Sequence, residues 1–309
     1  MRRYSIGSDI GGSHISCALV DMFEGQIFAE SRIEKDIDNK ANADVILNGW
    51  TEALQGTISR VGADNIAGVG FAMPGPFVYD KGIAMFDASV DKFEKLYKVD
   101  VAKELSSRLG LDVPFCFMND ASAFAVGEAW LGEAANVRRS VSVTLGTGFG
   151  SAFIEDGVPV VEGSGVPPKG CLWHLPVKDG IADDYFSTRW YVARWEEISG
   201  EKVNGVRPIA ERAETDKNAR GLFTEFGTNM GNFLGRWLKE FGADKLVIGG
   251  NVTGAYNLFG PALEDSLKQL KADTQVILSG LKEDAAIIGS ARMIDPEYFK
   301  LINPVLSKM

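Results

Sequence analysis

The chain of 309 residues is poor in cysteine and histidine. It contains three cysteines, Cys17, Cys116 and Cys171, and no two of them form a C-x-x-C pair. Disulfide scaffolds of secreted proteins and structural zinc sites both need more cysteines, at closer spacing. The low cysteine content therefore favours a reducing compartment, and we expect a cytoplasmic protein.

Long apolar runs and an excess of positive charge are also absent. No apolar run approaches the roughly 20 residues that a membrane-spanning helix needs, and no apolar signal segment precedes the first strand pattern. The formal net charge of −10 at pH 7 argues against nucleic acid or an anionic membrane surface as a partner. An anionic small molecule could still bind through backbone amides and helix ends.

Strand and helix patterns alternate along the chain. Three strand patterns open it, and later strand and helix patterns follow each other without a low-complexity linker. Strands are expected at residues 4–9, 15–20, 26–33, 66–72, 113–118, 141–145, 151–155, 245–248 and 275–278. Helices are expected at residues 44–61, 99–109, 121–131, 219–241, from after residue 251 to residue 270, and at 285–293, and a polar tail after them. This order predicts an α/β protein, and the length suggests about two closely joined domains.

Asn119 and Asp120 end the strand pattern of residues 113–118, directly before a helical pattern. A carboxylate at the carboxyl end of a strand lies where open α/β sheets bind their ligands. The same residues could simply cap the helix that follows. This stretch alone leaves both interpretations open.

Two glycine-rich turns of similar sequence follow two of the strands. Residues 9–13 read D-I-G-G-S, residues 145–150 read L-G-T-G-F-G, and the two segments lie about 137 residues apart. Glycines let a backbone approach a ligand closely and point its N–H groups at an anion. The pair predicts an internal duplication with two phosphate-binding turns that face each other across a cleft. Ordinary glycine hairpins, alike by chance, are the alternative; a Walker A loop is excluded because no G-K-[ST] is present.

A glycine- and proline-rich stretch, residues 163–180, contains Cys171 and His174. A single histidine in a loop is more often an ordinary surface residue than a ligand. Asp183 and Asp184 follow at the start of a helical pattern, where negative charge is favourable for the helix dipole. That structural role is sufficient for Asp184.

In this order, the motifs resemble those of the ROK (repressor, open reading frame, kinase) family of sugar kinases, within the actin-like ATPase superfamily. The resemblance covers nearly the whole chain. Residues 9–13 resemble the family's first phosphate motif, D-x-G-G-T, and residues 145–150 resemble its second, L-G-T-G-x-G. Residues 73–76 match the P-G-P loop, and residues 119–123 resemble the N-D-x-N-A motif. Residues 247–251 match the adenosine-side V-I-G-G motif, and residues 288–291 resemble the C-terminal G-A-A helix. Ser122 stands where the family's second Asn is usual.

The chain departs from the family pattern near the sugar motif. Cys171-Leu172-Trp173-His174 stands for E-x-G-H, so that Cys171 replaces a sugar-binding Glu. The family's zinc motif C-x-C-G-x-x-G-C-x-E is missing, and we therefore expect no zinc. Asp183 aligns with the family's second sugar-binding Glu and is shorter by one methylene.

The resemblance implies a duplicated, two-lobed actin-like ATPase (ribonuclease H-like) fold with a cleft between the lobes. Residues 1–117 with 293–309 would form the small N-terminal lobe, and residues 118–292 the large C-terminal lobe. It also implies a homodimer. The family's repressors carry an additional N-terminal winged helix, and since this chain begins at the first phosphate strand we expect it not to bind DNA.

The resemblance further implies ATP-dependent phosphorylation of a hexose or hexose derivative, expected on O6, with Asp120 as the general base. Asp9 would hold Mg²⁺, directly or through water, because that ion favours one or two carboxylates together with phosphates. The sugar would be bound by Asn119, Cys171, His174 and Asp183. ATP would be bound by Asp9, Gly11, Gly12, Ser13, Gly146, Thr147, Gly148, Gly249 and Gly250.

Two other functions stay open at this point. One is a catalytically weakened regulatory protein that senses a sugar or a nucleotide, suggested by Cys171 and the missing zinc motif. The other is an actin-like ATPase that acts on something other than a hexose. The presence of both phosphate turns together with Asp120 favours the sugar kinase.

Overall fold

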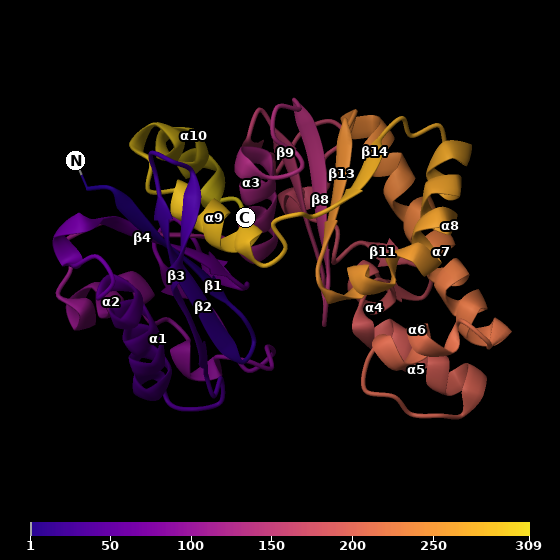
Figure 1. Ribbon diagram of the computed structural model, residues 1–309, viewed down its shortest axis with the longest axis horizontal. Helices are drawn as coiled ribbons and strands as arrows, with labels where there is room; N and C mark the ends of the chain where they lie inside the picture. The colour runs from indigo at the N-terminus through magenta and orange to yellow at the C-terminus, as the bar shows by residue number, and fades with distance from the viewer. Residues whose placement is uncertain (1) are drawn as a thin grey trace. The chain divides into compact units, whose positions relative to one another are not determined.

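The computed structural model describes residues 2–309, which divide into two compact units. Residues 2–132 and 283–309 form the first unit, and Glu133–Lys282 form the second. Each unit is built around one five-stranded sheet (Figure 1).

The sheet of the first unit begins as an antiparallel meander. Strands β1 (Tyr4–Ile10), β2 (His14–Asp21) and β3 (Gln26–Asp36) follow one another along the chain. Strands β4 (Ile66–Met73) and β7 (Phe115–Asn119) then add parallel to β1 and to β4. The strand order is β3-β2-β1-β4-β7. A short hairpin, β5 (Phe77–Val78) and β6 (Ile83–Ala84), lies outside this sheet.

The sheet of the second unit repeats this topology. Strands β8 (Arg139–Leu145), β9 (Phe149–Glu155) and β10 (Val158–Pro159) form the meander. Strands β13 (Lys245–Gly249) and β14 (Gln275–Leu278) add parallel beside β8, in the order β10-β9-β8-β13-β14. A small hairpin pairs β11 (Pro176–Val177) with β12 (Gly180–Ile181). The predicted duplication and α/β class are confirmed.

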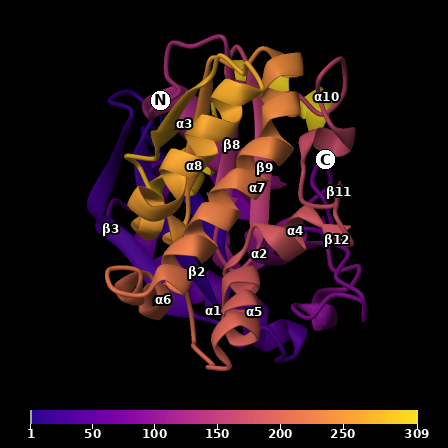
Figure 2. The ribbon, with the colours of Figure 1, turned by 90° about the vertical axis from the view of Figure 1, so that its right-hand side faces the viewer.

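Helices accompany each sheet. In the first unit they are α1 (Ala43–Ile58), α2 (Val101–Leu109), α3 (Asp120–Leu131), α9 (Asp284–Arg292) and α10 (Pro296–Leu306), with 3₁₀ turns η1 (Ala63–Asn65) and η2 (Glu94–Leu96). In the second they are α4 (Ala182–Tyr185), α5 (Thr188–Ser199), α6 (Arg207–Arg212), α7 (Lys217–Phe241) and α8 (Tyr256–Gln269), with η3 (Pro168–Gly170) and η4 (Asn251–Ala255). Helices α7 and α8 run side by side (Figure 2) and contribute Phe226, Leu234 and Phe259 to the core of the second unit.

The backbone of helix α9 is in direct contact with the backbones of other elements of the first unit. A Cβ on Gly70 of β4 would lie 1.9 Å from the carbonyl oxygen of Ser290, and a Cβ on Gly289 would lie 1.8 Å from that of Ala123 in α3. Since glycine has no Cβ, these elements can touch directly. The contacts place α3 and α9 in the first unit, whereas the sequence led us to expect residues 118–132 and 283–292 in the C-terminal lobe.

Residues 296–306, expected as part of a polar tail, form helix α10. Asp295 caps it by accepting the N–H groups of Glu297 and Tyr298 at 2.9 and 3.4 Å, and Pro296 occupies the first turn. Tyr298 and Ile302, four residues apart, are buried along one face. The two prolines of this segment obscured the helical spacing in the sequence.

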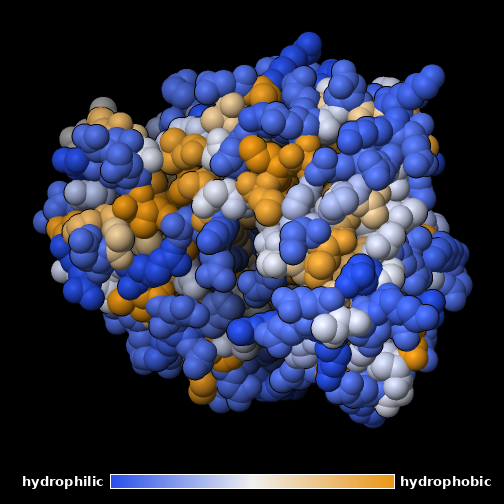
Figure 3. Space-filling view, turned by 45° about the vertical axis from the view of Figure 1, so that its right-hand side comes forward, coloured by the Kyte–Doolittle hydropathy of each residue, from blue (hydrophilic) through white to orange (hydrophobic). Residues whose placement is uncertain are grey.

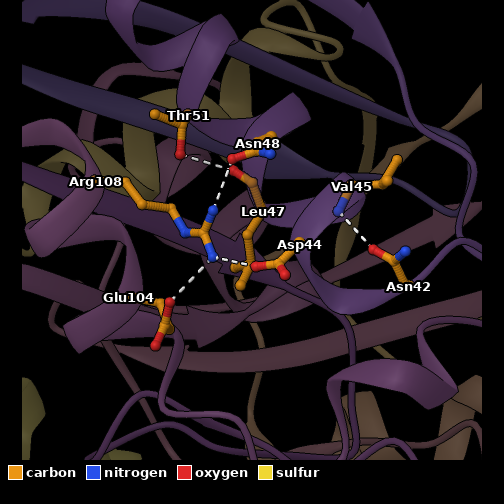
Figure 4. A network of polar contacts seen from close by, with 8 residues as sticks. All are labelled: Asn42, Asp44, Val45, Leu47, Asn48, Thr51, Glu104 and Arg108. Atoms are coloured by element: carbon orange, nitrogen blue, oxygen red, sulfur yellow. Dashed lines mark hydrogen bonds and ion pairs between the residues drawn. The ribbon is translucent and has the colours of Figure 1, made fainter.

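Arg108 joins helices α1 and α2 in the first unit (Figure 4). Its Nη1 donates to the Oδ1 of Asn48, and its Nη2 to the Oδ1 of Asp44, both at 2.6 Å. Nη2 also donates to Glu104 Oε2, one turn before Arg108 on α2, at 3.2 Å. We assign these contacts a purely structural role, because they fix the position of one helix against the other.

The surface is mainly hydrophilic on the face drawn in Figure 3, with several hydrophobic patches among the polar residues. Among the large apolar side chains, Phe23, Leu301, Val45 and Trp173 have exposed fractions of 65, 60, 53 and 47%. Among the helices in residues 2–309, none combines the length and the apolar character that crossing a membrane would require.

Candidate functional site

Three neighbouring parallel strands of the first unit bring several candidate residues to one edge of its sheet. Asp9 of β1 is level with Ala72 of β4, and Met73 of β4 is level with Asn119 of β7. Asp120 begins helix α3 directly after β7. Because the carboxyl ends of parallel strands share an edge, Asp9, Asn119 and Asp120 lie together as ligand-binding residues do in open α/β sheets.

Asn119 caps helix α3 and at the same time orients Asp120. Its Oδ1 accepts the N–H groups of Ala121 and Ser122 at 3.1 and 3.3 Å. Its Nδ2 donates to Asp120 Oδ1 at 2.9 Å and to the Tyr79 hydroxyl at 3.4 Å. Asp120 Oδ1 also accepts the Ala121 N–H at 2.9 Å. The capping interpretation is therefore correct for Asn119, and it holds the carboxylate of Asp120 in one orientation.

The second carboxylate oxygen of Asp120, Oδ2, has no hydrogen-bond partner in residues 2–309. Asp120 is partly exposed. One oxygen is thus held by the protein, and the other is available to accept a proton or a hydrogen bond from a bound molecule.

Asp9 lies in a negatively charged environment. Burial of its carboxylate and the charges of Asp120 and Glu283 raise its pKa to about 7. Glu283 directly precedes helix α9 and joins this edge only through the packing of that helix. A cation bound beside Asp9 would favour the ionised carboxylate.

The residues around Asp9 fit Mg²⁺. That ion takes oxygen ligands and commonly binds one or two carboxylates, keeping water and substrate phosphates as its other ligands. Asp9 and Asp120 offer such carboxylates. The described part of the chain holds no group of three or more His, Cys, Asp and Glu side chains that could hold a metal ion.

The first glycine turn connects β1 to β2 and leaves two backbone donors unused. The Gly11 N–H donates to the His14 carbonyl at 2.9 Å, and the Ile37 N–H donates to the Ser13 carbonyl at 2.8 Å. The N–H groups of Gly12 and Ser13 have no acceptor among residues 2–309. A Cβ on Gly12 would have no atom within 4 Å, so the space above the turn is open.

The second glycine turn, between β8 and β9, has the same features. The Gly146 N–H donates to the Gly148 carbonyl at 3.0 Å, and the N–H groups of Thr147 and Gly148 have no acceptor in the described chain. A Cβ on Gly146 would again have no atom within 4 Å. Adjacent free N–H groups in an open turn can bind an anion such as phosphate.

Gly249 and Gly250 lie beside the second turn. Gly249 ends β13 and is level with Thr144 of β8. Gly250 has φ +89°, and a Cβ there would lie 2.4 Å from the carbonyl oxygen of Leu145. Glycine is therefore required at 250 both by the backbone conformation and by the close approach to the strand that leads into the second turn.

Cys171 and His174 are neighbours in the second unit. The Cys171 Sγ lies 3.7 Å from His174 Nδ1. Burial raises the pKa of the Cys171 thiol, and burial with the nearby Lys169 charge lowers the pKa of His174. Both side chains are therefore neutral at pH 7, and the pair offers weak or uncharged hydrogen-bonding groups where the family pattern has a carboxylate.

Asp183 is connected to the second turn. Its N–H donates to the Trp173 carbonyl at 3.0 Å, so it also adjoins the Cys171–His174 segment. Its Oδ1 accepts the N–H of Phe149, the residue after the turn, at 2.7 Å. Its Oδ2 pairs with Arg189. Both oxygens expected to bind a sugar are thus already bonded to the protein.

Sequence reasoning missed two charged residues of these sites, Glu283 and Arg189. Arg189, just after the start of α5, has a half-exposed side chain and approaches the second turn through Asp183. Arg189 lies six residues after Asp183 and in the next helix, so the spacing of the two residues carries no periodic signal. Glu283 is far from Asp9 in the sequence, so nothing local indicated their proximity.

Two repeated sheets, each with a glycine turn after its first strand, define the duplicated actin-like ATPase fold. The chain belongs to the ROK family, whose model matches residues 5–296. It is 26% identical to a glucokinase of Thermotoga maritima over 94% of this chain and 96% of the relative. It is 29% identical to an N-acetyl-D-glucosamine kinase of Mannheimia succiniciproducens over 74% of this chain and 79% of the relative.

A solved structure supports the fold assignment. A ROK family glucokinase from Streptomyces griseus, in complex with glucose and AMPPNP, is similar to this chain with a TM-score of 0.74 at 23% identity. The similarity covers 94% of this chain and 98% of that one. The predicted ROK resemblance and actin-like fold are confirmed.

Proposed function

We propose that this protein is an ATP-dependent sugar kinase that phosphorylates a hexose or hexose derivative, on O6. Its membership of the ROK family and the sugar kinases among its relatives support the class of reaction. The observation that carries the proposal is Asp120, which has one oxygen held by Asn119 and the other without a protein partner, beside Asp9.

Asp120 would act as the general base. With Oδ1 held by two N–H donors, Oδ2 is the oxygen that would accept the hydroxyl proton of the sugar. Phosphoryl transfer passes through a loose transition state, so the protein mainly positions groups and neutralises charge. A carboxylate held in one orientation beside the acceptor hydroxyl fits that task.

The free N–H groups of the two turns would bind phosphate oxygens of ATP, through Gly12 and Ser13 in the first unit and Thr147 and Gly148 in the second. Mg²⁺ would be held by Asp9 and would supply positive charge to the phosphates. Gly249 and Gly250 would line the nucleotide site next to the second turn.

Asn119, Cys171, His174 and Asp183 would contact the sugar. Asn119 and Asp183 already make hydrogen bonds within the protein, so each would bind a hydroxyl with its remaining donor or acceptor capacity. Cys171 would offer only a weak partner, and it would therefore alter which sugar is preferred.

The expected homodimer is part of the proposal and is testable by light scattering.

The test is a coupled assay of ADP release with hexoses, N-acetylhexosamines and other hexose derivatives. We expect release that depends on one class of sugar and on Mg²⁺, and a phosphorylated product with phosphate on O6 by mass spectrometry and NMR. Reactions without sugar control for simple ATP hydrolysis. Absence of sugar-dependent ADP release from a folded protein that binds ATP would overturn the kinase assignment.

A regulatory protein that senses a sugar or nucleotide is the second candidate. Cys171, a neutral thiol in place of a charged ligand, is the observation that favours it. The same experiment separates the two functions: a regulator would bind sugar or ATP in calorimetry without turning either over.

A further inference from the structure

Neither phosphate turn contains a basic residue. Residues 9–16 and 144–155 hold no Lys and no Arg. Phosphoryl transfer nevertheless requires neutralisation of the phosphate charge, to which metal ions and basic side chains both contribute. Mg²⁺ at Asp9 would act in the first unit, and a basic side chain beside the second turn would have to come from another part of the chain.

Arg189 is connected to the second turn by two contacts. Its guanidinium pairs with Asp183 Oδ2, while Asp183 Oδ1 accepts the N–H of Phe149 at 2.7 Å. The preceding residue, Thr188, donates its N–H to the carbonyl of Gly146 at 2.8 Å. The start of helix α5 is therefore held against the turn through Thr188 and, by way of Asp183, through Arg189.

We propose that Arg189 contacts the phosphates of the bound nucleotide at the second turn. This inference rests on the proposed function. Asp183 is the only partner of the guanidinium in residues 2–309, and 57% of the side chain is exposed. An arginine has five N–H donors in a planar fork, which suits two phosphate oxygens at once. Most of that fork is free to bind a phosphate.

The position of Asp183 also favours a contact between Arg189 and a bound phosphate. A Cβ on Gly148 would lie 2.9 Å from Asp183 Oδ1, so a carboxylate stands directly against the turn. An unpaired carboxylate there would repel a phosphate bound by Thr147 and Gly148. Arg189 neutralises this charge, and its exposed donors extend the anion-binding surface of the turn.

The test compares the dissociation constants of Mg–ATP, Mg–ADP and AMP by calorimetry for the wild type, R189Q and R189K. Loss of a charge-assisted hydrogen bond predicts roughly 10- to 100-fold weaker Mg–ATP binding by R189Q. R189K should recover part of this loss. AMP affinity should change by less than about threefold, since AMP lacks the distal phosphates.

Arg194 provides a matched control on the same helix. It is 39% exposed and pairs with Glu197 and Glu225, away from the turn. R194Q should bind Mg–ATP like the wild type. Wild-type Mg–ATP affinity in R189Q, or an equal loss of AMP affinity, would overturn the proposal, since the first excludes a contact and the second indicates a general structural change.

A double variant separates direct contact from simple neutralisation of Asp183. If Arg189 contacts the phosphates, D183N/R189Q should recover only the part of the loss that comes from the unpaired Asp183 carboxylate, and should still bind Mg–ATP at least about fivefold more weakly than the wild type. Recovery of wild-type affinity would mean that Arg189 only masks the carboxylate, and the proposal would be wrong. Sugar-dependent turnover together with unchanged Mg–ATP affinity in R189Q would reject this inference alone. Arg189-dependent Mg–ATP binding without turnover of any sugar would reject only the proposed kinase function.

Discussion

The two sheets of this protein share their topology but differ in the charge at their carboxyl edges. In the first unit Asp9 is the penultimate residue of β1, and Asp120 and Glu283 lie near it. In the second unit Thr144 occupies the corresponding position of β8, and the nearby Asp183 is paired with Arg189. The two units thus have the same sheet topology but different charges at this edge.

The two units share the backbone geometry of their glycine turns. Gly12 and Ser13 in one turn, and Thr147 and Gly148 in the other, present free N–H groups, and the space above Gly12 and Gly146 is open. Strand order and direction generate this geometry twice, since each turn joins the first two strands of a sheet. The charged side chains differ: Asp9, Asp120 and Glu283 make the first edge acidic, whereas Asp183 beside the second turn is paired with Arg189.

We expect the largest effect from Asp120→Asn, which tests whether only the first unit supplies a residue for proton transfer. Asp120→Asn removes the free carboxylate oxygen, and the loss of a general base typically lowers the rate by a factor of about 10² to 10⁴. Asp183→Asn should reduce kcat less than tenfold and act mainly on KM, because its oxygens bond the protein. Steady-state kinetics of both variants would decide; equal losses of kcat would contradict the division between the units.

Asp9→Asn should change how stability depends on pH. The folded pKa of Asp9, about 7, lies above the ordinary value of 3.8. The folded state therefore keeps its proton longer than the unfolded state, and wild-type stability falls as pH rises from about 4 to about 7. An Asn side chain does not titrate, so the stability of Asp9→Asn lacks this dependence on pH. Without Mg²⁺, the free energy of unfolding of Asp9→Asn minus that of the wild type should therefore increase by roughly 1–3 kcal/mol from pH 5 to pH 8.

Urea denaturation at the two pH values measures this difference. Adding Mg²⁺ with ATP should stabilise the wild type at pH 8 and stabilise Asp9→Asn less. Thr144→Val, at the corresponding position of the second unit, is the control and should show no such pH dependence. A constant difference between Asp9→Asn and the wild type from pH 5 to pH 8 would show that Asp9 is not perturbed.

Cys171→Glu tests the sugar side of the second unit. A carboxylate there would accept charge-assisted hydrogen bonds from hydroxyls, each contributing about 1.5–3 kcal/mol, whereas a thiol is a weak donor and acceptor. The variant should therefore improve kcat/KM for glucose by roughly 10- to 100-fold relative to the native preferred sugar. An unchanged order of preference across the sugar panel would mean that Cys171 does not face the sugar.

The smallest effects concern the two open glycines. Gly12→Ala and Gly146→Ala add a methyl group where no protein atom lies within 4 Å, so the free energy of unfolding should change by less than about 0.5 kcal/mol. ATP affinity should fall roughly tenfold in each, because the methyl group occupies the space over the free N–H donors. Gly221→Ala on helix α7, also in open space, should leave ATP affinity unchanged. A loss confined to one turn would show that only that turn binds phosphate.

The order of the elements could be predicted from the sequence. Strand patterns predicted β1, β4 and β7 to within a few residues, and the spacing of large apolar residues predicted α7. These signals are local, since they depend on residues close together in the chain. The similar sequences of the two glycine turns also predicted the duplication, because a backbone turn that occurs twice requires similar residues at both places.

Helix α10 and the bounds of the units could not be predicted in this way. Pro296 and Pro304 obscured the face formed by Tyr298 and Ile302, although proline is compatible with a first helical turn. The placement of α9 depends on contacts such as Gly70 with Ser290, whose residues are far apart in the sequence. Such pairings become visible only when the chain is folded.

The sequence by itself determined which chemical groups are present: the two turns, the pair Asn119–Asp120, and the neutral Cys171. Only the tertiary structure decided their surroundings, by bringing Glu283, just before helix α9, to Asp9 and Arg189 to Asp183 beside the second turn. The physical reason is that a short sequence motif specifies its own backbone and side chains. The charge around it depends on the packing of distant segments, and electrostatic interactions act through space.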